Sequence, residues 1–358
     1  MTRIIECVPN FSEGRNQTVI SGIVNAIASA EASGSHVKVL HVDPGEGANR
    51  TVVTFVGTPE AVCEAAFRGV QAAGELIDMR VHQGTHPRSG ATDVLPLVPV
   101  AGVTLEECAE LARQLAARIF QELGIACYCY EASAFRPEHR NLAVCRAGEY
   151  EALPEKMCDP IRRPDFAPAS YDESMARSGA TTIGARDFLI AVNFNLNTTS
   201  VPDATAIACD VRERGKKARE GGLPDGAVLK DDQGNDIWIR GTLKGCKAIG
   251  WYIDEYGIAQ VSMNITDIHA TPLHKAYQEV CRAAAARGIQ VTGTEIIGMV
   301  PKHVLIDAGV YFLKQAHQPA DRDDNEIIDA AIEAMHLDDL CPFDPRQKII
   351  EYRMDDET

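Results

Sequence analysis

The sequence lacks the features of several large protein classes. It carries 35 Lys and Arg against 51 Asp and Glu, which gives a formal net charge of −16. Proteins that bind nucleic acids or anionic membranes need basic surface to neutralise phosphates, so this deficit of positive charge argues against both. No stretch offers about 20 consecutive apolar residues for a membrane span. The N-terminal residues also lack the apolar run of a signal peptide.

Metal and disulfide motifs are scarce as well. The 11 cysteines include no CxxC pair, and the closest two are Cys127 and Cys129. Zinc ribbons and thioredoxin motifs need CxxC-type spacing, and a secreted disulfide framework favours an even number of cysteines in a shorter chain. We therefore expect reduced thiols in a cytoplasmic protein. Walker, GxSxG and DxDxDG motifs are absent, and Gly45-x-Gly47 leads into a second strand, so NAD, ATP and calcium sites lose support.

What is present fits a globular protein with two lobes. The chain has 358 residues, of which 45% are hydrophobic and 24% charged, and domains usually hold roughly 100–200 residues. Runs rich in β-branched residues predict strands in the first half at residues 4–9, 37–42, 51–56, 94–100 and 125–130. Helices are predicted after the turn cluster Asn10–Gly14, after Thr58-Pro59 and after the capping box of Thr104 and Glu107.

The second half repeats this plan. Strands are expected at residues 188–194, 248–253 and 258–265, and helices at 203–214 and after Thr271-Pro272. We interpret the pattern as an α/β (α+β) protein with two ferredoxin-like split-βαβ subdomains. The boundaries expected are residues 1–180 for the N-terminal subdomain, 181–340 for the C-terminal subdomain and 341–358 for a tail. Residues 228–240 predict an excursion hairpin on the second subdomain.

Residues 82–93 contain two glycines and a proline and predict an irregular loop. His82 and His86 have the spacing of two zinc ligands on a helix, but the loop cannot be helical, so we expect no metal. Two other interpretations remain open. The histidines are solvated or structural, or one of them is an acid/base group presented by the loop. Asp43, at the end of a predicted strand, is either a turn residue or a partner of His86.

Arginine dominates the basic residues of the first half. The first 186 residues hold 17 Lys and Arg, of which only Lys38 and Lys156 are lysine. Because guanidinium pairs carboxylates through two hydrogen bonds, at least two of these arginines are expected to line a cleft for an anionic substrate. The candidates are Arg50, Arg80, Arg88, Arg136, Arg140, Arg162, Arg163 and Arg177.

A series of motifs carries a resemblance to a known family. They are Glu6–Gly14, Asn49–Val52, Phe55–Gly57, His86-Pro-Arg88, Arg146–Pro154, Pro164-Asp-Phe166, Gly184-Ala-Arg186, Gly250-Trp-Tyr252 and Leu340–Phe343. In this order they resemble glutamate formimidoyltransferase, which in animals is the N-terminal half of formimidoyltransferase-cyclodeaminase. The resemblance covers essentially the whole chain, and no cyclodeaminase domain is expected.

The resemblance implies transfer of a formimidoyl group from N-formimidoyl-L-glutamate to N5 of tetrahydrofolate in histidine degradation. It also implies a cytoplasmic homodimer, a folate cleft between the two subdomains, and tetrahydrofolate, with or without a polyglutamyl tail, as co-substrate. The family's catalytic histidine falls on His86. By adjacency to the motifs, Asp43 is expected to orient His86 or stabilise the amidinium, and Arg88 to hold a substrate carboxylate.

The family's folate segment falls on residues 167–179. Its expected folate contacts are Ala167, Pro168, Ala169, Ser170, Tyr171, Ser178 and Gly179. Two alternatives stay open at this stage. The same site can transfer formyl from formylglutamate to give 5-formyltetrahydrofolate, or the chain is a catalytically silent folate-binding module. The presence of His86, Asp43 and Arg88 together argues against the silent module.

Overall fold

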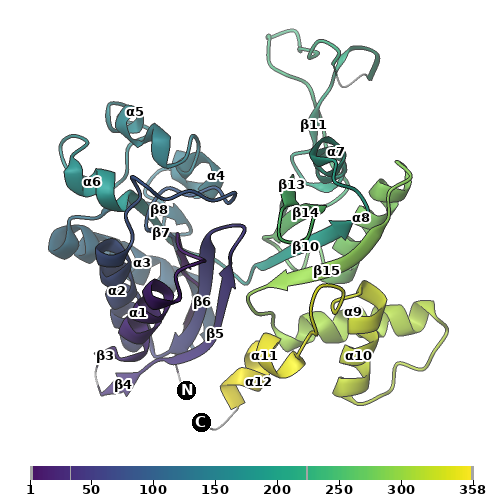
Figure 1. Ribbon diagram of the computed structural model, residues 1–358, viewed down its shortest axis with the longest axis horizontal. Helices are drawn as coiled ribbons and strands as arrows, with labels where there is room; N and C mark the ends of the chain where they lie inside the picture. The colour runs from purple at the N-terminus through teal and green to yellow at the C-terminus, as the bar shows by residue number, and fades with distance from the viewer. Residues whose placement is uncertain (1–2, 33, 223–224, 356–358) are drawn as a thin grey trace. The chain divides into compact units, whose positions relative to one another are not determined.

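The computed structural model describes residues 3–32, 34–222 and 225–355. The chain forms two compact units, Met1–Asp187 and Phe188–Thr358 (Figure 1). Expectations that touch residues 1–2, 223–224 or 356–358 lie outside the described residues.

The first unit is built on one mixed sheet. Its strands are β1 (Ile4–Cys7), β2 (Asn10–Phe11), β5 (Lys38–Gly45), β6 (Arg50–Gly57), β7 (Thr92–Ala101), β8 (Ala126–Glu131) and β9 (Ala180–Ala185). β1 and β2 form one interrupted strand that pairs with β6 on one side and β7 on the other, antiparallel in each case. β5 pairs antiparallel with the outer side of β6. A small separate hairpin joins β3 (Glu31–Ala32) to β4 (Ser35–His36).

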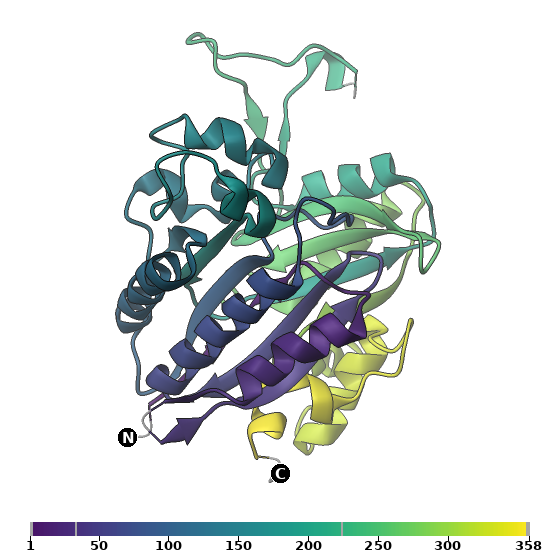
Figure 2. The same cartoon turned by 60° about the vertical axis from the view of Figure 1, so that its left-hand side comes forward.

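Three helices cover one face of this sheet. They are α1 (Gln17–Ala28), α2 (Pro59–Leu76) and α3 (Leu105–Leu123), and Figure 2 shows α1 and α2 running along the same side. Asn16 and Thr58 cap the first two through their side chains, and Thr104 forms the expected capping box with Glu107. With β7, β1, β6 and β5 in that spatial order, this is the ferredoxin-like split-βαβ arrangement that the sequence predicts.

The sheet extends beyond this arrangement through β9 and β8. β9 lies between β7 and β8 and is parallel to both. The sequence analysis did not expect β9, because Ala180–Ala185 contains only one large apolar residue, Ile183. β9 belongs to the first compact unit, which extends to Asp187.

An irregular segment covers the opposite face at β8. It contains η1 (Pro137–Arg140), α4 (Leu142–Cys145), η2 (Tyr150–Ala152), α5 (Leu153–Met157) and α6 (Glu173–Ser178). Their apolar side chains bury Tyr128 and Tyr130 of β8 in a second core cluster. The buried dyad of His139 and Asp165, with Nδ1 and Oδ2 2.9 Å apart, belongs to this segment, and Asp165 also accepts the backbone N–H of Cys129. This dyad therefore fixes the segment to the edge strand.

The second unit repeats the same topology. Its sheet has the antiparallel order β13 (Cys246–Ile253), β14 (Ile258–Ile265), β10 (Ile190–Leu196) and β15 (Val291–Ile297). The helices are α7 (Val201–Val211), α8 (Leu273–Ala285), α9 (Lys302–Gln315), α10 (Asp324–Met335), α11 (Pro345–Lys348) and α12 (Ile350–Asp355). α7 begins before the expected residue 203, because Ser200 caps it and Pro202 lies in its first turn. The internal repeat and the mixed α/β class are thus confirmed.

The expected excursion leaves this unit between α7 and β13 (Figure 1). β11 (Lys216–Lys217) pairs with β12 (Trp238–Ile239), and η3 (Glu220–Gly222) lies between them in the chain. A further bridge joins Lys230 to Asp236. Nowhere in the described residues does a helix have the length and apolar character needed to cross a membrane.

Candidate active site

The loop that carries the two histidines has no regular structure from residue 82 to residue 89, as its glycines and proline predict. His82 and His86 therefore do not share a helix face. Within the part of the chain that the structure describes, no group of three or more His, Cys, Asp or Glu side chains is arranged to hold a metal ion. The position of this loop depends instead on hydrogen bonds to four other segments of the first unit.

Asn49 holds the first half of the loop. Its side-chain oxygen accepts the N–H of Gly14 at 3.0 Å, and its amide nitrogen donates to the carbonyl of Gln83 at 2.7 Å. Its own carbonyl faces Nε2 of His82 at 3.1 Å. A Cβ at Gly84 would lie 2.4 Å from the carbonyl oxygen of Ala48, so this close approach requires glycine. His82 is thus a structural residue of the loop.

The second half of the loop is held by β2 and by the segment that ends α6. Ser12 donates its hydroxyl to the carbonyl of Gly90 at 2.8 Å. The N–H of Ala91 donates to the carbonyl of Ser178, and the N–H of Ala180 donates to the carbonyl of Ser89. Gly179 has φ of +68°, and a Cβ there would lie 2.2 Å from the oxygen of Ser89. The backbone at residues 178–180 therefore joins the histidine loop directly.

His86 contacts the first residue of β6. Val53 and Phe55 point from β6 into the core under α1, α2 and α3, so Arg50, by strand alternation, lies on the opposite face of the sheet. Its Nη1 donates to Nε2 of His86 at 2.5 Å. Because a guanidinium donates only, Nε2 is the unprotonated nitrogen and the neutral ring carries its proton on Nδ1.

His86 is a neutral imidazole in this environment. Burial, followed by the positive charges of Arg50 and Arg146, holds its pKa well below the usual value. A neutral histidine can accept a proton near pH 7, which is the property that a general base needs. The pKa of His82 is also depressed, first by burial and then by the charges of Arg88 and Arg15, and Nε of Arg88 lies 3.4 Å from its Nδ1.

Arg146, which the sequence analysis did not single out, is the second cation near His86. It follows α4, and its Nη2 donates to Oδ2 of Asp93 at 2.7 Å. The Asp93 side chain is 1% exposed, and its Oδ1 accepts the N–H of Ser89 at 2.9 Å. Burial raises the pKa of Asp93, while the charge of Arg146 opposes that effect. The sequence offered one signal for this pair, because Asp93 is a charged residue at the apolar start of β7.

Arg88 is engaged by two carboxylates. Its guanidinium meets Glu151 through two hydrogen bonds of 2.8 and 2.7 Å and Glu149 through one of 3.2 Å. Its carbonyl accepts the N–H of Tyr150 at 2.9 Å. The charge of Arg88 lowers the pKa of Glu151. These contacts give Arg88 a role in holding the loop, and the expectation that it binds a substrate carboxylate remains a prediction.

Asp43 lies near the end of β5. It stands opposite Val52 of β6. Its side chain therefore lies on the same face of the sheet as Val52 and Arg50, opposite α1 and α2. The register thus brings Asp43 to the same region of the sheet as Arg50. A direct pairing of Asp43 with His86 stays a prediction.

Most of the other candidate arginines do not lie beside His86. The ion pairs are Arg80 with Asp78 and Glu173, Arg88 with Glu149 and Glu151, Arg136 with Asp165, Arg162 with Glu155, and Arg177 with Asp78. Arg163 donates to the carbonyl of Pro168 at 2.9 Å. The acid-rich composition explains these pairs. Positive charge beside His86 comes from Arg50 and, outside the predicted set, from Arg146.

The expected folate segment divides into two parts. Residues 167–172 are irregular, with Ala169 and Ser170 exposed and Tyr171 packed against the second core cluster. Asp172 caps α6, whose last residue, Ser178, is buried. Ser178 and Gly179 lie against the histidine loop, as described above. The segment therefore reaches from exposed backbone to the immediate vicinity of the residues that follow His86.

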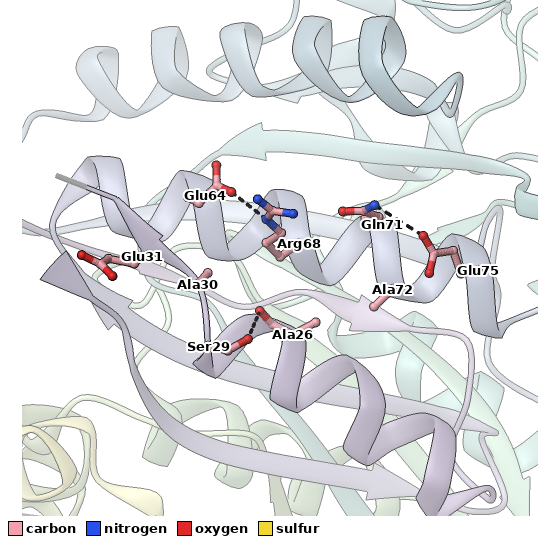
Figure 3. Close-up of a pocket in the computed structure, with 9 residues that line it drawn as sticks. All are labelled: Ala26, Ser29, Ala30, Glu31, Glu64, Arg68, Gln71, Ala72 and Glu75. Atoms are coloured by element: carbon pink, nitrogen blue, oxygen red, sulfur yellow. Dashed lines mark hydrogen bonds and ion pairs between the residues drawn. The ribbon is translucent and has the colours of Figure 1, made fainter. Parts of the chain in front are cut away.

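A groove on the helix side of the unit is separate from this site. It has a volume of about 390 Å³ and lies between α1 and α2 (Figure 3). Its lining residues are Ala26, Ser29, Ala30, Glu31, Glu64, Arg68, Gln71, Ala72 and Glu75. The polar side chains pair with one another, Arg68 with Glu64 and Gln71 with Glu75. The groove holds none of the residues discussed above and offers no acid/base group of its own beyond paired carboxylates.

Comparisons with known proteins agree with this architecture. The N-terminal subdomain of the formiminotransferase domain matches residues 4–186, and the formiminotransferase domain matches residues 191–355. The chain is 43% identical to formimidoyltransferase-cyclodeaminase of Gallus gallus, over 98% of this chain and 60% of that protein. It is 39% identical to glutamate formimidoyltransferase of Streptococcus pyogenes serotype M1, over 88% of this chain and 94% of that protein.

A second glutamate formimidoyltransferase, from Thermoplasma acidophilum, is 39% identical over 87% of this chain and 92% of that protein. The chain therefore belongs to the formiminotransferase family, and the resemblance found in the sequence is confirmed. It spans about 60% of the length of the formimidoyltransferase-cyclodeaminase relatives that it matches.

Proposed function

We propose that this chain transfers the formimidoyl group of N-formimidoyl-L-glutamate to N5 of tetrahydrofolate, giving 5-formimidoyltetrahydrofolate and L-glutamate. The observation that carries the proposal is a neutral histidine flanked by two arginines, in a chain whose relatives include proteins named glutamate formimidoyltransferase. His86 is the proposed catalytic residue. The pathway that this activity serves is histidine degradation.

The chemistry of the transferred group explains the need for a base. A formimidoyl group is an amidine that carries positive charge near neutral pH, so its carbon is already electrophilic. As N5 of the folate attacks this carbon, the N5–C bond forms and the N5 proton must leave. His86 accepts that proton and then returns one to the glutamate nitrogen as its bond to carbon breaks. General acid–base help of this kind contributes typically 10²–10⁴-fold.

The remaining site residues support His86 in this proposal. Asp43, on the same face of the sheet as Arg50, orients His86 or stabilises the cationic amidine. Arg88 positions the loop through Glu149 and Glu151. Folate binds along Ala167, Pro168, Ala169, Ser170 and Tyr171 and reaches Ser178 and Gly179, where the segment meets the histidine loop.

Other parts of the proposal concern the whole protein. Tetrahydrofolate is the co-substrate and no metal takes part. The protein acts in the cytoplasm as a homodimer on small molecules, with no nucleic-acid or membrane partner, in keeping with the net charge of −16.

The test compares two histidine variants by steady-state kinetics with formimidoylglutamate and tetrahydrofolate. His86→Ala should lose 10²–10⁴-fold in kcat, because the acid/base group is gone. His82→Ala is the matched control from the same loop and should keep most of kcat with a lower Tm. A His86→Ala protein with near-wild-type kcat would contradict the role of His86.

The same assay separates the alternatives. Turnover of formylglutamate at a higher kcat/KM than formimidoylglutamate would favour formyl transfer to 5-formyltetrahydrofolate. Folate binding without turnover of either donor would favour a silent folate-binding module. The positive charge of the amidine is the feature that Asp43 is placed to recognise, so Asp43→Asn should lower the preference for formimidoylglutamate over formylglutamate.

A further inference from the structure

The guanidinium of Arg146 is only partly satisfied by hydrogen bonds within the described residues. It is 16% exposed, and Nη2 is fixed by a 2.7 Å hydrogen bond to Asp93. Its Nε is buried and has no hydrogen-bond partner among the residues that the structure describes. A buried donor without a partner loses its hydrogen bonds to water and gains none in return, so proteins rarely keep one without a reason.

Asp93 explains how such a guanidinium stays in place. Its carboxylate is 1% exposed, and its two oxygens hold two different parts of the site. Oδ2 accepts from Arg146, and Oδ1 accepts the N–H of Ser89 in the histidine loop. Arg146 is thus tied to the backbone three residues after His86, and its charge reaches the imidazole strongly enough to lower the pKa of His86.

The charges that act on His86 favour an anion near Arg146. Arg50 and Arg146 both lower the pKa of His86, and Asp93 meets only Nη2 of the Arg146 guanidinium. Arg88, the other arginine of the loop, already meets the carboxylates of Glu149 and Glu151. A carboxylate from a ligand would accept from the Nε of Arg146, which has no partner among the described residues.

We propose that Arg146, held by Asp93, binds one carboxylate of the glutamate portion of N-formimidoyl-L-glutamate. The inference rests on the proposed function for the identity of the substrate. Arg146 is then a specificity-determining residue and Asp93 a positioning residue. Because guanidinium and carboxylate pair through charge-assisted hydrogen bonds, a substrate that lacks this carboxylate is discriminated against at the binding step.

The contact between Arg146 and a substrate carboxylate is tested by kinetics in which the substrate and the residue are changed separately and together. The donors are N-formimidoyl-L-glutamate and its two monoamides, each with one carboxylate replaced by an amide. Wild-type protein should lose about 10- to 100-fold in kcat/KM with one of the two amides. Arg146→Gln should lose a similar factor with the parent substrate, mostly through KM, and lose little more with that amide.

The control is Arg118→Gln. Arg118 lies on α3, where it pairs with Glu64 at 2.7 Å and Glu122 at 3.0 Å, away from the loop. The Arg118→Gln variant should leave the ratio of kcat/KM between the parent substrate and each amide unchanged. Arg146→Lys, which keeps the charge and can reach Asp93, provides a variant that folds if Arg146→Gln does not, and it should show an intermediate KM.

Two outcomes would overturn the proposal. Arg146→Gln could keep the full wild-type discrimination against both amides. It could instead lower Tm and weaken all three donors equally, which is the behaviour of a residue that only clamps Asp93. Binding of L-glutamate, measured by calorimetry on the wild-type and variant proteins, is independent of turnover. If the wild type binds glutamate through Arg146 but transfers nothing, the proposed function fails and this inference stands.

Discussion

Arg50 donates to Nε2 of His86, the nitrogen that accepts a proton in the proposed mechanism. The contact between Nη1 and Nε2 is 2.5 Å long, and the charge of Arg50 also lowers the pKa of His86. The arginine therefore has two effects that oppose each other. It keeps the imidazole neutral near pH 7, and it occupies the lone pair of that neutral ring. The proposed mechanism therefore requires the guanidinium to move off Nε2 when substrate binds.

Replacing Arg50 should change the pH dependence of the reaction. In the proposed mechanism activity requires neutral His86, so kcat/KM should fall as the pH drops through the pKa of His86 in the free protein. Arg50→Gln removes one cause of the depressed pKa and should move this acid limb to higher pH by about one unit. Proton NMR of the His86 ring during a pH titration should show the same upward change. If the acid limb stays at the same pH, Arg50 does not control the pKa of His86.

Arg88→Lys tests whether Arg88 is a loop residue or a substrate ligand. Lysine cannot make the two hydrogen bonds to Glu151, so we expect a loss of about 1–2 kcal/mol in the free energy of unfolding. The KM for formimidoylglutamate should change little, since the guanidinium is engaged by Glu149 and Glu151. A selective rise in KM at unchanged stability would instead assign Arg88 to a substrate carboxylate, as the sequence resemblance implied.

Gly179→Ala should damage both the fold and the site. Its φ is +68°, and the new Cβ would lie 2.2 Å from the oxygen of Ser89. Gly288→Ala is a matched control, because Gly288 has φ of +70° but nothing within 4 Å of the added atom. We expect Gly288→Ala to cost about 1 kcal/mol from backbone strain alone. Gly179→Ala should cost clearly more in urea denaturation and also lower kcat, and equal losses in the two variants would contradict this packing.

Lys156 should make stability depend on pH in the alkaline range. It is 1% exposed, donates to the carbonyl of Cys145 at 2.7 Å, and burial lowers its pKa from 10.5 to about 8. Between these two values the unfolded chain binds more protons at this residue than the folded chain, so the free energy of unfolding rises with pH. The gain between pH 8 and 10.5 should be on the order of 2 kcal/mol.

Lys156→Met isolates this contribution. The variant cannot titrate, so its unfolding free energy should rise less between pH 8 and 10.5 than that of the wild type. Measuring both proteins by urea denaturation subtracts the cysteines and tyrosines that titrate in the same range. Parallel pH profiles for the two proteins would show that Lys156 keeps an ordinary pKa in the folded state.

Much of the fold was predictable because local signals and burial agree. The helix starts at Thr58-Pro59 and at Thr104 carry side-chain caps that act on the next few residues, and the strands of β5, β6, β13 and β14 are rich in β-branched residues. β9 was missed because Ala180–Ala185 is mostly small residues. Its strand character comes from two parallel neighbours, and no local pattern in six residues reports them.

The site divides in the same way. The irregular loop around His86 follows from its own glycines and proline, and the motif resemblance selected His86 over His82. The pairing of Arg146 with Asp93 was missed, although Arg146 opens one of the motifs and Asp93 starts an apolar strand, because no local pattern reports a contact between residues 53 positions apart. Arg50 and Arg88 looked alike in the sequence. Only the folded chain separates them, placing one against His86 and the other against Glu149 and Glu151.

The junction of Gly179 with Ser89 and Gly90 has a thermodynamic consequence. The end of the proposed folate segment and the backbone just after His86 are joined by two hydrogen bonds and by contact too close for any side chain. A shift of the backbone at residues 178–180 therefore also moves the backbone at residues 89–91. If folate orders residues 167–179, it also adjusts the pocket for the glutamate donor, and the donor must strengthen or weaken folate binding by the same factor. The two substrates would then bind with measurable linkage, although each contacts a different segment of the chain.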